Sequence, residues 1–208
     1  MNIKVCGITQ LKQLQQLDGL DIDYAGLIFY KDSPRFVGDK INKNELKQAD
    51  LDIRKVGVFV DAKYEEIKKT IDEFGLDVVQ LHGEEDPMLC KQLSRDTEVI
   101  KVFRPNADVS VDEMIEEYDS VCDYYLFDTS TGLSTAGGTG KSFDWELVGE
   151  ANIEKPFFLS GGIGPDDVAK IKAFDHPDFF GIDINSKFEK EPGVKDMGEI
   201  LKFTRGLK

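Results

Sequence analysis

The sequence predicts an α/β protein built on a parallel β-sheet, and two features of the chain carry this prediction. Short runs rich in β-branched and aromatic residues recur along all 208 residues, and most of them are continuously apolar, as expected for strands that are covered on both faces. Most runs are followed by a polar turn and then by a stretch with helical periodicity. Repeated alternation of strand and helix is typical of a parallel sheet with crossover helices.

Eight apolar runs define the expected strands, which are residues 3–6, 24–30, 55–60, 78–82, 99–103, 124–128, 157–160 and 180–184. Eight is the number of strands that closes a parallel barrel, and about 200 residues is the lower end for that fold. The structural alternative is an open doubly wound sheet, but the first turn lacks the glycine fingerprint G-x-G-x-x-G of that class. We therefore expect residues 1–208 to form one domain, a (β/α)8 TIM barrel.

Helices are expected between these runs. A leucine stripe over residues 11–17 follows the first run, with Thr9 as the expected N-cap. Residues 62–74 predict a surface helix that ends at Gly75. Further helices are expected over residues 43–49, 86–93, 111–118, 166–174 and 196–203.

Composition and charge restrict the class of partner. The net charge of −14 argues against nucleic acid, because a nucleic-acid binder needs clustered Lys and Arg. No apolar run approaches the roughly 20 residues that span a bilayer, and the first residues do not resemble a signal peptide. Three widely spaced cysteines predict neither a disulfide framework nor a metal-binding pair. We expect a cytoplasmic protein that binds no membrane and no nucleic acid. Its oligomeric state, monomer or homodimer, stays open.

The functional residues of a (β/α)8 barrel stand at the C-terminal ends of its strands, so the polar residues that end each run are the candidates. Cys6 ends the first run and Asp128 ends the sixth. A small buried hydrophobe is the commoner role of a lone cysteine, and we assign that role to Cys90 and Cys122. Cys6 differs from them by its place at the end of a strand.

Two further strand ends carry polar side chains. Arg35 follows the second run in a Ser-Pro-Arg turn, where a planar guanidinium can bind a carboxylate or a phosphate. Gln80 and His82 share one face of the fourth strand because side chains alternate along a strand. The second histidine, His176, lies in a His-Pro turn, and no nearby carboxylate pair suggests a metal at His82, so no metal site is expected.

The last two strand ends predict a phosphate site. Gly161 and Gly162 follow the seventh run, and Asn185 and Ser186 follow the eighth. Glycines let the backbone approach an anion closely, and the loops after strands seven and eight are the recurring phosphate site of these barrels. A long loop rich in small residues, 130–141, follows the sixth run, and a loop of this kind is expected to act as a lid or to embrace a ligand.

Taken as a set, these residues resemble the phosphoribosylanthranilate isomerases, the (β/α)8 enzymes of tryptophan biosynthesis. The motifs span the chain in the family's order: K-V-C-G-I-T at 4–9, S-P-R at 33–35, G-V-F-V at 57–60, V-Q-L-H-G at 79–83, D-T at 128–129, G-G-T-G-x-x-F-D-W at 137–145, S-G-G-I at 160–163 and E-P-G-V-K-D at 191–196. The first motif and the glycine-rich one are specific, whereas S-G-G-I is shared by many phosphate-binding barrels.

The resemblance implies an Amadori rearrangement of a phosphorylated aminosugar, N-(5-phosphoribosyl)anthranilate, to 1-(2-carboxyphenylamino)-1-deoxyribulose 5-phosphate, with no cofactor and no metal. It implies that Asp128 is the acid that protonates the ribose ring oxygen and that Cys6 is the base that removes the C2 proton. The substrate-binding residues would be Arg35, Gln80, His82, Gly161, Gly162, Asn185 and Ser186, with Arg35 on the anthranilate carboxylate and the last four on the phosphate.

Two details of the site stay open in the sequence. Lys4 shares a strand face with Cys6 by alternation, so its ammonium could favour the thiolate. After the eighth run the chain reads Asn185-Ser186-Lys187-Phe188, where many family members have a Ser-Ser-Gly-type turn. The missing glycine changes how closely the backbone can approach a phosphate, and the charge of Lys187 could compensate.

Two rival functions differ from this one in the residues that they require. Another sugar-phosphate barrel, indole-glycerol-phosphate synthase, would need catalytic lysine and glutamate at strand ends, and a histidine-pathway isomerase would need an aspartate where this chain has Cys6. A non-catalytic sugar-phosphate-binding protein on the same scaffold would need neither Cys6 nor Asp128. The presence of both residues therefore favours an isomerase.

Overall fold

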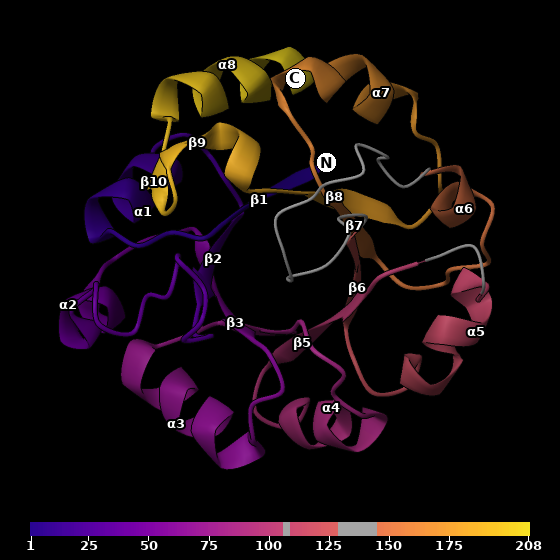
Figure 1. Cartoon of the computed structure of the whole chain (residues 1–208), viewed down its shortest axis with the longest axis horizontal. Helices are drawn as coiled ribbons and strands as arrows, with labels where there is room; N and C mark the ends of the chain where they lie inside the picture. The colour runs from indigo at the N-terminus through magenta and orange to yellow at the C-terminus, as the bar shows by residue number, and fades with distance from the viewer. Residues whose placement is uncertain (106–108, 129–144) are drawn as a thin grey trace.

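The computed structural model describes residues 1–105, 109–128 and 145–208 of the chain. Eight strands, all parallel to their neighbours, pair in chain order, and the eighth pairs back to the first, so the sheet closes into a barrel. Viewed along the barrel, the strands form an inner ring and the helices surround it (Figure 1). The expected (β/α)8 barrel is confirmed.

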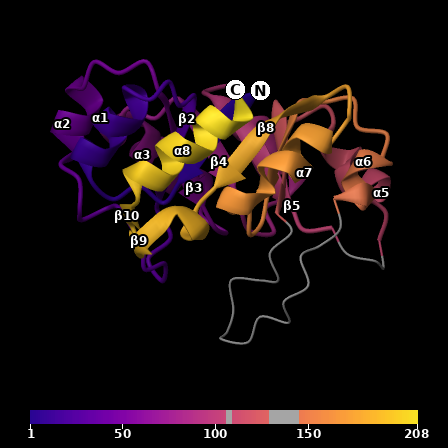
Figure 2. The same cartoon turned by 90° about the horizontal axis from the view of Figure 1, so that it is seen from above.

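The strands occupy the runs expected from the sequence to within two residues at either end. They are β1 Asn2–Cys6, β2 Tyr24–Ile28, β3 Arg54–Phe59, β4 Val78–Leu81, β5 Glu98–Phe103, β6 Tyr124–Asp128, β7 Phe157–Ser160 and β8 Phe179–Ile184. A short antiparallel hairpin of β9 Glu189–Glu191 and β10 Val194–Lys195 follows β8 and was not expected. It lies on the side of the barrel away from the two chain termini (Figure 2).

The helices are α1 Leu11–Asp18, α2 Lys43–Gln48, α3 Tyr64–Phe74, α4 Pro87–Leu93, α5 Val111–Ile115, α6 Glu146–Gly149, α7 Val168–Ala173 and α8 Met197–Leu207. Short 3-10 segments extend three connections, η1 Glu116–Tyr118, η2 Pro165–Asp167 and η3 Ser186–Phe188. Gly75 ends α3 in the left-handed conformation, with φ of 63°, as its place in the sequence predicts. In the described ranges, no helix combines the length and the apolar character needed to cross a bilayer.

The expected N-cap of the first helix is wrong. Gln10, not Thr9, precedes α1, and no side chain caps its first turn. The hydroxyl of Thr9 instead donates to the carbonyl oxygen of Gly193, 2.6 Å away in the β9–β10 hairpin. A partner that lies 184 residues further along the chain outweighs the local cap, and this contact joins the loop after β1 to the hairpin.

One cluster of apolar side chains fills the barrel interior, and a second fills the space between the strands and the helices. The interior cluster consists of Tyr24, Val56, Val78, Ile100, Val102, Leu126 and Phe158. Because side chains alternate along a strand, the residues two positions further on face the same interior at the next level. Val78 is thus followed on its face of β4 by Gln80 and then by His82, closer to the C-terminal end of the barrel.

Candidate active site

A cavity of about 200 Å³ opens at the C-terminal ends of the strands. Eight of the nine site residues expected from the sequence line it: Cys6, Arg35, His82, Asp128, Gly161, Gly162, Asn185 and Ser186. Gln80 is the ninth, and it does not border the cavity because its side chain is fully buried in β4, with its Nε2 2.8 Å from Nδ1 of His82. The structure therefore places Gln80 behind His82, away from the cavity wall.

Cys6 ends β1 at the wall of this cavity, with 5% of the residue exposed. Its neighbour in register on β2 is Gly26, where a methyl group would lie 2.6 Å from the sulfur, so only glycine leaves room for the thiol. Burial raises the pKa of the Cys6 thiol; the charges of Lys4 and Lys195 oppose this shift, and the carboxylate of Asp183 adds to it. The net direction is upward, so the thiol form is favoured at rest.

The ammonium of Lys4 is paired inside the barrel. Lys4 and Asp183 are neighbours in the register of β1 and β8, and Nζ lies 2.9 Å from Oδ1. Burial acts to lower the pKa of Lys4, but its interactions with Asp183 and Cys6 outweigh burial and the pKa is raised. Lys4 thus faces the interior as alternation predicted. It moderates the pKa of Cys6 without bringing that pKa below the ordinary thiol value.

Asp128 ends β6 and lies at the end of a chain of three polar side chains. Its Oδ2 is 3.3 Å from Nε2 of His82, and Nδ1 of His82 is 2.8 Å from the amide nitrogen of Gln80. The side chains of Asp128 and His82 are 12% and 17% exposed, whereas Gln80 is fully buried. These three side chains therefore lead from the cavity to the buried amide of Gln80.

Arg35 is held in place by the β9–β10 hairpin. Its Nε and Nη2 donate to the carboxylate of Glu189 at 2.6–3.0 Å. Lys195 donates from the other side to Oε1 of Glu189 at 2.8 Å and to Oδ1 of Asn185 at 2.7 Å. Burial acts to raise the pKa of Glu189, but Arg35 and Lys195 outweigh it and the pKa is lowered. Glu189 and Lys195 of the hairpin therefore link Arg35 to Asn185, and the lowered pKa keeps Glu189 ionised.

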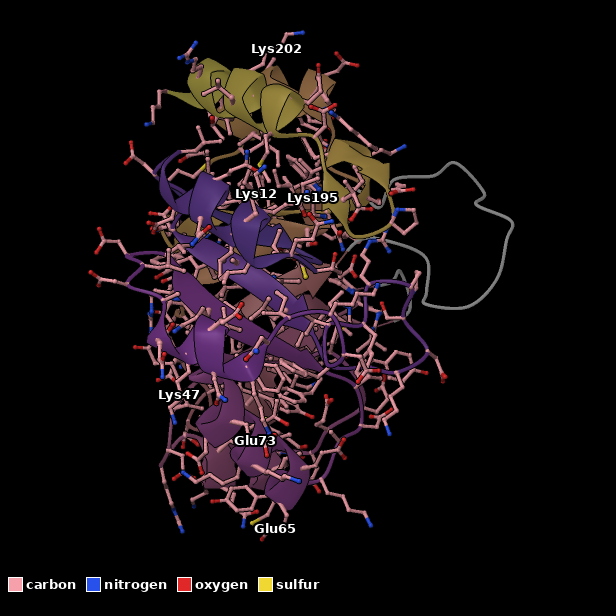
Figure 3. All side chains as sticks on the ribbon, turned by 90° about the vertical axis from the view of Figure 1, so that its left-hand side faces the viewer. Lys12, Lys47, Glu65, Glu73, Lys195 and Lys202 are labelled. Carbon is pink, nitrogen blue, oxygen red and sulfur yellow. The ribbon has the colours of Figure 1, made fainter. Side chains whose placement is uncertain are left out.

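Lys195 is buried, unlike the other lysines that Figure 3 labels. Lys12 and Lys202, on α1 and α8, are exposed, whereas the side chain of Lys195 is 0% exposed (Figure 3). Burial lowers the pKa of Lys195 although Glu189 acts against this shift. The motif E-P-G-V-K-D thus contributes a buried cation near the cavity, a role that spacing in the sequence did not indicate.

The turn after β7 has the backbone shape expected of an anion site. Gly161 and Gly162 have φ of 97° and 71°, in the left-handed region that favours glycine. The space that a side chain of Gly162 would occupy is open: apart from Gly162 and its two chain neighbours, no atom of the described residues lies within 4 Å. Asn185 and Ser186 border the same cavity from the end of β8. These four residues are brought together as the sequence predicted.

Sequence reasoning missed one cation of the cavity wall. Arg104 directly follows β5, and its Nη2 donates to the backbone oxygen of His82 at 2.6 Å. The rule that identified the other candidates, a polar residue directly after an apolar run, would have found Arg104. Glu189 could not be found in this way, because it follows β8 by five residues and reaches the site only through the hairpin.

Two other expectations concern the loop after β6 and the absence of a metal site. Thr129 and the glycine-rich loop 130–141 lie outside the described residues. Within residues 1–105, 109–128 and 145–208, no group of three or more His, Cys, Asp or Glu side chains is arranged to hold a metal ion. Cys90 and Cys122 are buried away from the cavity, and burial raises their pKa values to about 11 and about 12.

Comparisons with known proteins point to one family. The family model for N-(5′-phosphoribosyl)anthranilate isomerase matches residues 3–205. A protein named N-(5′-phosphoribosyl)anthranilate isomerase from Parabacteroides distasonis is 41% identical over 209 aligned residues, which cover 100% of this chain and 93% of that protein.

Solved structures agree with the sequence comparisons. The crystal structure of phosphoribosyl anthranilate isomerase from Thermotoga maritima superposes with a TM-score of 0.84 at 31% identity, covering 100% of this chain and 98% of that one. A phosphoribosyl anthranilate isomerase in complex with reduced 1-(o-carboxyphenylamino)-1-deoxyribulose 5-phosphate superposes with a TM-score of 0.80 at 27% identity, with the same coverage of 100% and 98%.

Proposed function

The chain belongs to the N-(5′-phosphoribosyl)anthranilate isomerase family, and we propose that Cys6 and Asp128 are the base and the acid of its reaction. The enzyme isomerises N-(5′-phosphoribosyl)anthranilate to 1-(2-carboxyphenylamino)-1-deoxyribulose 5-phosphate, a step of tryptophan biosynthesis. Its substrate is therefore a small phosphorylated molecule. One observation carries the residue assignment: Cys6 and Asp128, from β1 and β6, border the same cavity.

The reaction requires one proton donor and one proton acceptor. Asp128 gives its proton to the ribose ring oxygen, the bond from that oxygen to C1 breaks, and the anthranilate nitrogen forms a Schiff base with C1. The less populated thiolate form of Cys6 then removes the proton from C2, which leaves an enolamine. Return of a proton to C1 and formation of the C2 carbonyl give the aminoketose, so no atom is gained or lost. Acid–base catalysis of this kind contributes typically 10²–10⁴-fold to a rate.

The charges of the cavity suit a substrate with two anionic ends. The chain as a whole carries −14, yet Arg35 and Arg104 border the cavity and Lys195 lies just behind it. We assign the anthranilate carboxylate to Arg35 and the phosphate to Gly161, Gly162, Asn185 and Ser186. Contacts at both ends would hold the ribose between acid and base, and positioning of this kind can supply a large share of a rate enhancement.

The decisive test of the function is turnover by the purified, folded protein. We expect the fluorescence of phosphoribosylanthranilate to decay faster with the wild-type protein than in buffer, with one equivalent of the aminoketose formed. The Cys6→Ser variant, checked for folding by circular dichroism, is the matched control and should leave the decay near the buffer rate. A folded wild-type protein that binds the substrate without converting it would support the rival, a non-catalytic sugar-phosphate-binding protein.

Replacing Arg35 by alanine should chiefly raise KM. A charge-assisted hydrogen bond to a carboxylate is worth about 1.5–3 kcal/mol, so we expect KM to rise roughly 10- to 100-fold with kcat little changed. Steady-state kinetics measure this split. The fold should survive, because Glu189 keeps its bonds to Lys195 and to the backbone of Gly193, at 2.8 and 3.1 Å.

The matched control for this prediction is Arg35→Lys. Lysine keeps the positive charge but not the planar fork that binds both oxygens of a carboxylate, so its KM should lie between those of the wild type and Arg35→Ala. A fall in kcat with an unchanged KM would contradict the binding role of Arg35.

A further inference from the structure

The hydrogen bonds of His82 connect a fully buried amide with the residue that we assign as the acid. Nδ1 of His82 faces Nε2 of Gln80 at 2.8 Å, and Nε2 of His82 faces Oδ2 of Asp128 at 3.3 Å. A neutral imidazole has one nitrogen that donates and one that accepts. Whatever sets the role of Nδ1 therefore sets the role of Nε2, and with it the direction of the bond to Asp128.

Gln80 sets the role of Nδ1 in the orientation that the structure records. An amide nitrogen only donates hydrogen bonds, so Nδ1 of His82 must accept and Nε2 must carry the proton. That Nε2–H then points to a carboxylate oxygen of Asp128. The backbone of His82 is anchored at the same point, because Nη2 of Arg104 donates to its carbonyl oxygen at 2.6 Å. The imidazole thus has Gln80 at Nδ1 and Asp128 at Nε2.

The other end of the Gln80 amide gives a second, independent observation. Its carbonyl oxygen is buried and has no hydrogen-bond partner among the described residues. A buried polar atom without a partner is costly, and an apolar side chain at this position would avoid the cost. Gln80 does not border the cavity either, so contact with a ligand does not account for its amide. Among the described residues, the polar contact of its side chain is the bond to His82.

We propose that Gln80 and His82 are positioning residues for Asp128: Gln80 selects the ring nitrogen of His82 that carries the proton, and His82 orients the carboxyl group of Asp128 with the other nitrogen. The recorded orientation fits the carboxylate that remains after Asp128 has donated its proton. Turning the amide of Gln80 by 180° presents its oxygen to an Nδ1–H, and Nε2 then accepts from a protonated Asp128. One amide therefore serves both protonation states of the acid, with one unpartnered amide group in each.

This inference rests on the proposed acid role of Asp128 for its catalytic meaning, but its geometric content can be measured separately. The chain has only two histidines, His82 and His176, so 15N NMR of the imidazole nitrogens resolves both. His176 is an internal reference, because its Nδ1 accepts from the backbone N–H of Asp178 at 3.1 Å and its Nε2 lies 3.2 Å from the backbone oxygen of Ala151. Its contacts are to the backbone and should not respond to changes at Gln80.

The experiment compares the free wild-type enzyme with Gln80→Glu and Gln80→Met at neutral pH. In the wild type, His82 should be a single tautomer: Nε2–H while Asp128 is a carboxylate, or Nδ1–H while Asp128 holds its proton. In Gln80→Glu a carboxylate replaces the amide, so Nδ1 should be protonated while His176 stays unchanged. In Gln80→Met no donor faces Nδ1, so His82 should populate both tautomers. Each variant should lower kcat about tenfold, the effect of one lost hydrogen bond, with KM within about twofold of the wild-type value.

Several results would overturn the proposal. A wild-type His82 that populates both tautomers, as expected only for Gln80→Met, would do so, and this measurement requires no variant to fold. A tautomer of His82 that is unchanged in folded Gln80→Met would do so as well, even if activity fell, because the loss would then reflect packing alone. If the tautomers respond as expected but the wild type does not turn over phosphoribosylanthranilate, the positioning pair stands and the acid role of Asp128 is wrong.

Discussion

Replacing Cys6 by serine is expected to lower kcat by roughly 100-fold or more, the typical contribution of a positioned acid or base. A serine hydroxyl ionises far less readily than a thiol, so it cannot take the C2 proton at neutral pH. The side chain is almost isosteric and 5% exposed, so the barrel should fold as before. We expect Asp128→Asn to have an effect of similar size, because an amide N–H is far too weak an acid to protonate the ring oxygen. Steady-state turnover of phosphoribosylanthranilate measures both.

The matched control is the same exchange at Cys122. That thiol is buried outside the cavity and donates to the backbone oxygen of Tyr118 at 3.2 Å, a bond that a serine hydroxyl retains. Cys122→Ser should therefore keep kcat within about twofold of the wild-type value, since it touches no reacting group. A Cys6→Ser enzyme with wild-type kcat would show that the thiol is not the base.

Replacing Lys4 by methionine is expected to lower the free energy of unfolding by about 3–5 kcal/mol, the usual cost of removing one partner of a buried ion pair. Lys4 is completely buried and its ammonium lies 2.9 Å from Asp183, so the variant leaves an uncompensated carboxylate inside the barrel. Urea unfolding monitored by circular dichroism measures the change. Because the pKa of Lys4 is raised in the fold, its contribution is complete at pH values below about 10.5 and disappears as the pH rises through the raised pKa.

The double variant Lys4→Met/Asp183→Asn is the control for this prediction. It removes both charges, so it should recover part of the lost stability, and a double-mutant cycle isolates the coupling between the two residues. Stability that falls equally in the single and the double variant would contradict the role of the ion pair.

Lys4→Met should also change the reactivity of Cys6. Lys4 opposes the rise in the thiol pKa that burial causes, and Asp183 promotes it. Removing the cation therefore moves the pKa of Cys6 further up, and the pH at which iodoacetamide alkylates Cys6 should rise with it. Unchanged alkylation of Cys6 in a folded Lys4→Met enzyme would exclude an electrostatic role of Lys4.

The barrel itself could be predicted from local patterns. Continuous apolar runs identify strands that are buried on both faces, and their alternation with helices leaves few topologies for a parallel sheet. Eight runs in 208 residues then select closure, which the pairing of β8 with β1 confirms. Failures were confined to details that distant contacts decide, such as Thr9, whose hydroxyl bonds to the hairpin and does not cap α1.

The candidate site could be predicted in part for the same reason. Barrel closure brings all strand ends to one rim, so residues as distant in sequence as Cys6, Arg35 and Asp128 can be grouped from the order of the strands alone. Arg104 obeys the same rule and was overlooked. Gln80 was placed on the correct strand face with His82, but its depth below the cavity is not visible in a pattern of alternation.

By itself, the sequence determined the strands, the closure of the barrel and the residues at its rim, because these follow from the periodicity of apolar side chains. Only the tertiary structure decided how the charges are paired. The contacts of Lys4 with Asp183 and of Arg35 with Glu189 join residues 179 and 154 positions apart. Burial and these partners together set the pKa of Cys6 and the pKa of Arg35. Both depend on how much water and which charges surround a group, and neither quantity is local to the chain.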